Sequence, residues 1–392
     1  MNKLPPSQHR IRLALLGLFM RGTIVDLCNV LSLGFISPAI DVVAIALFIL
    51  GLFELIKTEK TFVFVSVTFF SVLWFLSARL FPPNVQYMAD EGKQFFIYCL
   101  PFMWMGWYFV KRNIFLDIFL PIAKMKLILA LIVQIIILLI PSRDIFEGDY
   151  QTAANSLIVG LISVYYLAAR DKKQKDILLA IFATLILFVS GSRSSLVAVF
   201  FFWSLYLLSQ LNARKAIRIV VILSFFVFVI GFDAILSPLV SMAGSLGFST
   251  HLSEAVSSGA VFNDENRELL YAGFVSMIWQ KPWGYGIMGD RYISYEYGLF
   301  YKPIYPHNIY LEVIINFGYV IGIIICALFT FFLFRAILIG NNKQYKVMIL
   351  VLASTSFVKL LFSSSYWIDQ MFFMLLGAMI APFFLKNGQI SN

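Results

Sequence analysis

The segment NIYLEVIINFGYVIGIIICALFTFFLF, residues 308–334, carries one charged side chain, Glu312, over its whole length. About twenty apolar residues in an α-helix are enough to cross the hydrocarbon core of a bilayer. A helix on the surface of a soluble protein would instead show a polar face. This segment therefore predicts a membrane-spanning helix.

The whole chain follows the same pattern. Of its 392 residues, 60% are hydrophobic and only 13% are charged, whereas soluble domains carry about 25% charged residues. We predict an all-α, polytopic transmembrane helical bundle of about twelve spans, forming a single membrane-embedded domain over residues 1–392. The expected spans are 13–34, 38–56, 60–80, 94–110, 124–141, 153–169, 176–190, 195–211, 217–235, 308–334, 346–363 and 368–385.

The first two spans are interrupted by charge. Arg21 and Asp26 fall in the first of them, and Asp41 and Glu54 fall in the second. Charged side chains inside a membrane are costly unless they find partners. We therefore expect ion pairs between these two spans.

Basic residues concentrate in alternate loops, which predicts the orientation of the bundle. By the positive-inside rule these loops are cytoplasmic, and so are both termini. The net charge of +9 then favours contact with anionic lipid over contact with nucleic acid. The opposite, outer set of loops is FPPNVQYMADEGK, PSRDIFEGDY, GSRSS, SSSYWID and the long stretch 236–307.

The long outer loop, residues 236–307, is expected to be partly helical. Its segment FNDENRELLYAGFVSMIWQKP, residues 262–282, predicts a helix that Pro282 stops. The sequence WGYGIMGDRY follows, and its glycines permit close approach of the backbone to a phosphate. Because no strand precedes this segment, we favour a plain surface turn over a phosphate-binding loop.

Several cationic residues stand at the outer ends of the predicted spans. Arg193 lies in the short GSRSS link, Arg267 in the first turn of the predicted loop helix, and His307 where the chain re-enters the membrane. A guanidinium fits phosphate oxygens well, and a histidine is suited to proton transfer. Anchoring to lipid headgroups and a purely structural histidine are the alternatives. Lys359 is costly in its span unless it faces an interior cavity or snorkels.

Three ordered motifs carry a resemblance to a known family. GSRSSLVAVFFF (191–202), NRELLYAGFVSMIWQKPWGYGIMG (266–289) and PHNIYLEVIINFGYVIG (306–322) together resemble the O-antigen polymerase and O-antigen ligase family of bacterial envelopes. The similarity covers residues 185–335. The family often places Gly-x-x-Gly nine residues after His-Asn. Here Gly318 is in place but the next glycine is Gly322, one position late, which slightly favours a polymerase.

The resemblance implies a metal-independent glycosyltransferase of the GT-C type, with no cofactor, in the bacterial cytoplasmic (inner) membrane. It would polymerise undecaprenyl-pyrophosphate-linked repeat units on the outer face into O-antigen or capsular polysaccharide. A chain-length regulator is an expected partner. Roles at the catalytic centre carry over to Arg193, Arg267 and His307. As substrate-binding residues we assign Asn308, Glu312, Arg291, Tyr285 and Lys359, with Asp290 and Asp369, like Glu312, as alternative bases.

Two other functions stay open at this point. A ligase would transfer finished polymer to lipid A–core by nearly the same chemistry. A lipid-linked oligosaccharide flippase is the alternative from another class, because twelve spans are typical of transporters. Transporters, however, tend to show internal repeats and broken helices at the midplane, and the sequence has no obvious repeat.

Overall fold

The computed structural model describes residues 5–139, 149–189, 193–210, 265–298, 303–339, 342–362 and 364–385, and every regular element in them is helical. The chain divides into two compact units. One comprises Met1–Glu54 and Ile114–Asn263, and the other comprises Leu55–Asn113 and Asp264–Asn392. The single membrane-embedded domain expected from the sequence stays a prediction.

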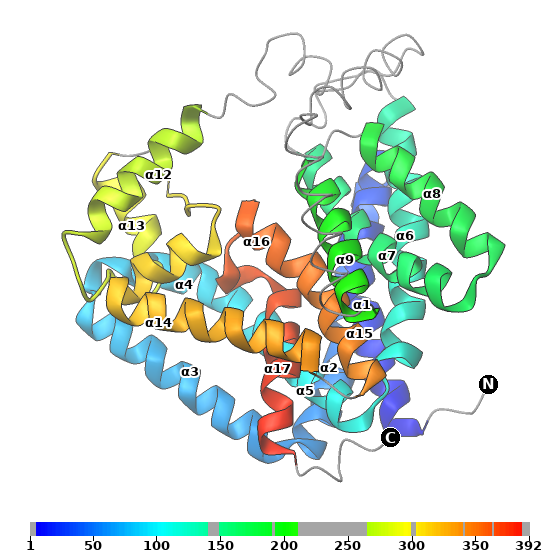
Figure 1. Ribbon diagram of the computed structural model, residues 1–392, viewed down its shortest axis with the longest axis horizontal. Coiled ribbons are helices and arrows are strands. Elements are labelled where there is room, and N and C mark those ends of the chain that lie inside the picture. Colours follow the sequence, from blue (N-terminus) through cyan, green and yellow to red (C-terminus); the bar gives the residue numbers. More distant parts are fainter. Residues whose placement is uncertain are drawn as a thin grey trace. The chain divides into compact units, whose positions relative to one another are not determined.

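The first unit is built around one central pair of helices, α6 and α7 (Figure 1). Gly160 of α7 allows this pair to approach closely, because a Cβ atom there would lie 2.5 Å from the Cβ of Leu127. Buried leucines and alanines from α6 to α9 fill the core beside it. The helices of this unit are α1 (Pro6–Val30), α2 (Ser37–Thr58, whose last turn belongs to the second unit), α6 (Phe115–Leu139), α7 (Asp149–Asp171), α8 (Gln174–Val189) and α9 (Arg193–Gln210).

Ion pairs join α1 to α2, which confirms the pairing expected between the first two spans. Arg21 holds Asp41 through two hydrogen bonds of 2.7 and 2.9 Å. Glu54 is held by Arg10, at 3.3 Å, rather than by a residue inside the first span. Each carboxylate therefore meets a guanidinium within the same unit, and the penalty for placing it among apolar helices is reduced.

The second unit packs α5 tightly against α17. Gly106 and Gly377 make this possible, since a Cβ atom on either would fall about 2 Å from a backbone oxygen of the facing helix, 2.0 Å from Met374 O and 1.9 Å from Met103 O. Small residues at such crossings let helix backbones touch. The helices of this unit are α3 (Lys60–Leu80), α4 (Val85–Gln94), α5 (Leu100–Arg112), α12 (Glu265–Ile278), α13 (Gly289–Glu296), α14 (Ile309–Ile339), α15 (Lys343–Leu352), α16 (Val358–Phe362) and α17 (Gln370–Phe384).

Two connections between helices of this unit are π-helical. A π-helical turn, Phe95–Cys99, joins α4 to α5, and a second one, Ala353–Phe357, joins α15 to α16. Helix α14 is broken at Gly318, whose φ of 80° and ψ of 163° are not helical. The kink leaves carbonyl groups before it without helical partners, and these become the attachment point for the loop described below.

Within the described residues each predicted span overlaps a helix, although the first, 13–34, extends beyond the end of α1 at Val30. The span expected at 217–235 lies outside the described residues. Among the residues that the structure describes, six helical stretches are long and apolar enough to cross a membrane. The chain is therefore a multi-pass membrane protein, and the total of about twelve spans stays a prediction. The six are Pro6–Val30, Gly34–Thr58, Lys60–Leu80, Phe115–Ile137, Ile309–Ile337 and Lys343–Phe362.

Candidate functional site

His307 occupies a tight turn directly before α14. Its φ of 54° is in the left-handed region, which non-glycine residues adopt rarely and which recurs at functional sites. The next residue, Asn308, fixes the turn, because its Oδ1 accepts hydrogen bonds from the backbone N–H groups of Tyr310 (3.0 Å) and Leu311 (3.2 Å). Asn308 thus caps the helix and holds the histidine at its N-terminal end.

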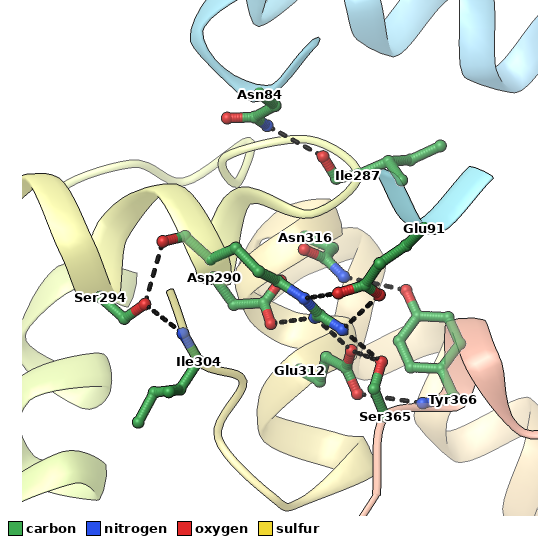
Figure 2. A network of polar contacts seen from close by, with 11 residues as sticks. Asn84, Glu91, Ile287, Asp290, Ser294, Ile304, Glu312, Asn316, Ser365 and Tyr366 are labelled. Atoms are coloured by element: carbon green, nitrogen blue, oxygen red, sulfur yellow. Dashed lines mark hydrogen bonds and ion pairs between the residues drawn. The ribbon is translucent and has the colours of Figure 1, made fainter. Parts of the chain in front are cut away.

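Arg291, on α13, is the centre of a buried polar cluster. Figure 2 labels its partners Glu91, Asp290, Glu312 and Ser365. Its Nε and Nη2 donate to the two carboxylate oxygens of Glu91 at 3.0 and 2.9 Å. Its Nη1 donates to Glu312 at 2.8 Å and also to Asp290, and Nη2 further donates to Ser365 Oγ at 2.7 Å. A guanidinium has five N–H donors, and these five contacts occupy all of them.

Glu312 ties this cluster to another segment of the chain. One of its carboxylate oxygens accepts from the Ser365 hydroxyl, and the other accepts from the backbone N–H of Tyr366 at 3.2 Å. Glu312 stands in the first turn of α14, where the helix dipole favours negative charge. It therefore links the start of α14 to the SSSYWID turn.

The cluster holds more negative than positive charge. Three carboxylates, those of Glu91, Asp290 and Glu312, surround one guanidinium. Burial raises the pKa of Asp290 to about 8, against the opposing pull of Arg291. Burial alone would lower the pKa of Arg291, but the neighbouring carboxylates outweigh it and raise that pKa. Burial thus favours the protonated form of Asp290, whereas the surrounding carboxylates favour the charged form of Arg291.

Tyr305 connects this cluster to His307. The guanidinium carbon of Arg291 lies 4.9 Å from the centre of the Tyr305 ring, within the range of a cation–π contact. The centres of the Tyr305 and His307 rings are 4.4 Å apart. Arg291, Tyr305 and His307 therefore form a continuous row of contacts in the second unit, in which the Tyr305 and His307 rings are tilted by 56°. We call these three residues, together with Glu91, Asp290, Glu312 and Ser365, the Arg291 cluster.

The glycine loop before α13 is buried, so the surface turn expected from the sequence is wrong. Residues 284–290 are all buried. The backbone N–H groups of Tyr285 and Gly286 donate to the carbonyls of Ile315 and Asn316, at 2.8 and 2.9 Å. The kink of α14 at Gly318 exposes these carbonyls. A glycine-rich sequence is typical both of an exposed turn and of a close contact between two backbones. In this loop the glycines permit a close contact between backbones.

Asn84 holds the other side of the same loop. Its Nδ2 donates to the carbonyls of Tyr285 (2.6 Å) and Ile287 (3.0 Å), and its side chain is buried. Figure 2 shows the contact with Ile287. The hydroxyl of Tyr285 donates to the carbonyl of Met277 at 3.1 Å. Tyr285 thus braces the loop against α12 in this structure.

Lys359 lies in an ion pair of its own. Its Nζ is 3.2 Å from Asp369, which also accepts from Ser356 (3.0 Å) and caps α17 through the N–H of Phe372 (2.8 Å). The lysine is thus neutralised by a carboxylate at a helix start. Of the residues assigned from the sequence, the structure joins His307, Asn308, Arg291 and Glu312, whereas Tyr285 and Lys359 contact other groups.

A family model matches residues 178–327 of the chain, and its description is O-antigen ligase. The chain carries an O-antigen ligase family domain. The comparisons with curated proteins and with solved structures gave no match. The O-antigen ligase match contains Arg193, Arg267, Arg291 and His307, and therefore covers the loop helix, the glycine loop and the re-entry turn of the second unit.

Two residues with predicted roles in the O-antigen ligase domain are described only by their backbone. Arg193 is the first residue of α9, in the first unit, and Arg267 lies in the first turn of α12, in the second. Both therefore stand at helix N-termini, where unpaired N–H groups and the helix dipole favour anions. Asn263 and Asp264, whose side chains are of the type that caps a helix start, lie outside the described residues.

Sequence reasoning missed several members of the Arg291 cluster. Glu91 and Ser365 come from outside the O-antigen ligase match, 200 and 74 residues away from Arg291. Both lie in segments predicted to be outer loops, FPPNVQYMADEGK and SSSYWID. Their predicted location on the same side of the membrane as Arg291 was the one indication in the sequence that they could contact it. Tyr305 was overlooked because an aromatic residue before Pro306 has no distinguishing pattern.

Proposed function

We propose that this chain is a glycosyltransferase that polymerises undecaprenyl-pyrophosphate-linked repeat units on the outer face of the bacterial cytoplasmic membrane. The observation that carries the proposal is the family match over residues 178–327, because that stretch contains every residue to which we assign catalysis. The Arg291 cluster supports it, since the buried polar contacts of Arg291 and Glu312 give the His307 turn a fixed geometry.

The reaction exchanges one bond to the anomeric carbon for another. A hydroxyl oxygen of the acceptor attacks that carbon, and the bond to the lipid pyrophosphate breaks. His307 takes the proton of the hydroxyl or binds the phosphate. The leaving pyrophosphate gains negative charge, which Arg193 and Arg267 offset in place of a metal. Arg291 has no donor left for a phosphate, so its role in this proposal is to position Tyr305 and His307.

Alanine variants test the assignment. We expect Arg193→Ala, Arg267→Ala and His307→Ala each to abolish long-chain surface polysaccharide, measured by gel analysis of the cell envelope, while the protein still inserts. His9→Ala and Arg170→Ala are matched controls, because His9 is exposed and Arg170 pairs with Asp171 on the surface. Polymer at wild-type length in all three inserted variants would defeat the proposal.

The ligase is the second candidate, and the description of the matched family favours it. Deletion of the gene separates the two activities. Loss of a polymerase leaves a single repeat unit on the acceptor lipid, whereas loss of a ligase leaves the acceptor without any repeat unit.

The proposal also requires His307 to face away from the cytoplasm. We expect a reporter active only outside the cytoplasm to be active when inserted in the long loop, and inactive when fused to either terminus. An active reporter at both termini would reverse the orientation and would remove the argument for a lipid-borne donor.

A further inference from the structure

A groove of about 750 Å³ runs along the second unit between α3, α5 and α17. Its position is independent of the Arg291 cluster, because none of the cluster residues lines it. Its volume falls within the range of small-molecule binding sites. One end is charged and the rest is apolar except for Ser66, so a ligand that fills the groove needs both a charged and an apolar part.

The charged end lies where α2 gives way to α3. Lys57, Lys60 and Lys111 line it together with one acidic residue, Glu59. Glu59 is buried and already bound, since it accepts from Lys111 at 2.9 and 3.1 Å and from Trp107 Nε1 at 3.0 Å. Lys57 and Lys60 are exposed at the rim. The mouth of the groove therefore carries a positive charge.

The N-terminus of helix α3 adds to the positive charge at the mouth of the groove. The helix begins at Lys60, and its preceding residue makes no side-chain capping bond. The first N–H groups of a helix lack intrahelical partners, and the dipole makes this end positive. With two exposed lysines beside it, the helix end offers an anion both N–H donors and cationic partners.

The remainder of the groove is an apolar trough. Phe62, Val65 and Phe69 line it from α3, and Ile380 and Phe384 line it from α17. Phe62 stacks on Trp107 at 4.1 Å, which closes the trough floor near the charged end. From Phe62 to Phe69 the wall extends about 10 Å at 1.5 Å per residue. Such a trough accommodates a hydrocarbon chain.

The trough opens sideways toward the bilayer. Val65 is 57% exposed and Phe69 59% exposed, although both belong to a candidate membrane span. Apolar side chains exposed on a spanning helix face lipid tails, whereas the lysines at its end stand at the headgroup level. A ligand that matches both parts is an amphiphile with a phosphate at one end and an acyl chain at the other.

We propose that this groove binds one anionic phospholipid, with its phosphate at Lys57, Lys60 and the start of α3 and an acyl chain along Phe62, Val65 and Phe69. The site lies at the end of α3 that the sequence predicts to be cytoplasmic, and thus in the leaflet opposite the proposed chemistry. It does not depend on the proposed function, because a lipid can be held whether or not the chain transfers a glycan.

Lipid retention by the purified full-length protein tests this site. The protein in detergent is offered phosphatidylglycerol and phosphatidylethanolamine with identical acyl chains, and retained lipid is counted by native mass spectrometry. We expect one phosphatidylglycerol to be retained in preference to phosphatidylethanolamine. The double variant Lys57→Gln/Lys60→Gln should weaken that retention roughly tenfold or more, since each basic residue near an anionic lipid contributes appreciably.

Two matched variants define the outcome. Lys172→Gln/Lys175→Gln removes two exposed lysines from another loop and should leave retention unchanged. Val65→Trp fills the trough and should reduce retention of both lipids. Equal retention of the two lipids by the wild type, or unchanged preference in Lys57→Gln/Lys60→Gln, would overturn the proposal. Neither result bears on polymer synthesis.

Discussion

Arg291 donates a 2.8 Å hydrogen bond to Glu312, and both side chains are almost fully buried although 21 residues separate them in the chain. This bond joins α13 to the first turn of α14, directly after the His307 turn. Because the same guanidinium also holds Glu91 and Ser365, it fixes three other segments of the second unit at once.

Replacement of Arg291 by methionine should destabilise the protein strongly. The change leaves buried carboxylates without their cation, and breaking a buried ion pair in this way costs about 3–5 kcal/mol. Glu312→Gln should be milder, because the amide oxygen still accepts from Arg291 and Ser365. Tryptophan fluorescence during thermal unfolding in detergent measures the stability of both variants.

Arg170→Met is the control, because it removes an ion pair at the surface and should cost at most about 1 kcal/mol. An equally small loss of stability in Arg291→Met would contradict the structural role of the cluster.

Stability should depend on pH through Asp290. In the unfolded chain its carboxyl has the ordinary pKa of 3.8, and burial raises the pKa to about 8 in the folded protein. Between these values the folded state holds a proton that the unfolded state has released, so raising the pH favours unfolding. We expect the unfolding temperature to fall from about pH 4 to pH 8.

The variant Asp290→Asn is the test of that assignment, since its amide stays neutral. Its unfolding temperature should vary less over the same range than that of the wild type. Glu296→Gln, at the exposed end of the same helix, should keep the wild-type slope. An identical slope in Asp290→Asn would show that another group is responsible.

The close contact between two backbones at Gly318 should not tolerate a side chain. A Cβ atom there would lie 2.0 Å from the carbonyl oxygen of Pro282, and the φ of 80° disfavours any other residue. We expect Gly318→Ala to prevent accumulation of folded protein, judged by yield and by elution as a single species. Gly298 also has a positive φ, of 66°, but open space around it. Gly298→Ala should therefore cost only about 1–2 kcal/mol, and equal yields of the two variants would contradict the packing described here.

Tyr305 should affect activity more than stability if it positions His307. Tyr305→Phe keeps the ring between the guanidinium and the imidazole, so polymer length should be close to that of the wild type. Tyr305→Leu removes the cation–π contact with Arg291 and the ring contact with His307, and should lower the rate of transfer with little change in KM, in a purified assay with lipid-linked substrate. Tyr295→Leu, an exposed tyrosine on the same unit, is the control. Equal activity in Tyr305→Leu and wild type would remove the positioning role.

Helices were the most predictable feature, because each depends on a local run of residues. The long apolar segment after His307 became α14, and the loop helix ended before Pro282 as expected. The glycine loop was misinterpreted, because its burial depends on a kink in α14 about 30 residues later. The roles of Arg193, Arg267 and His307 stay predictions, although the structure places His307 in contact with Tyr305 at the edge of a buried polar cluster.

The sequence by itself determined that this is a multi-pass helical membrane protein with motifs of the O-antigen polymerase and ligase family. The hydropathy of a helix depends only on its own residues, so membrane-spanning helices can be predicted without knowledge of the tertiary structure. Only the tertiary structure decided that Glu91, Glu312 and Ser365 share the guanidinium of Arg291, and that Lys57 and Lys60 stand over an apolar trough. Those arrangements depend on how helices distant in the sequence pack against each other. Packing excludes water from around a buried charge, and only then do its contacts with particular partners become strong.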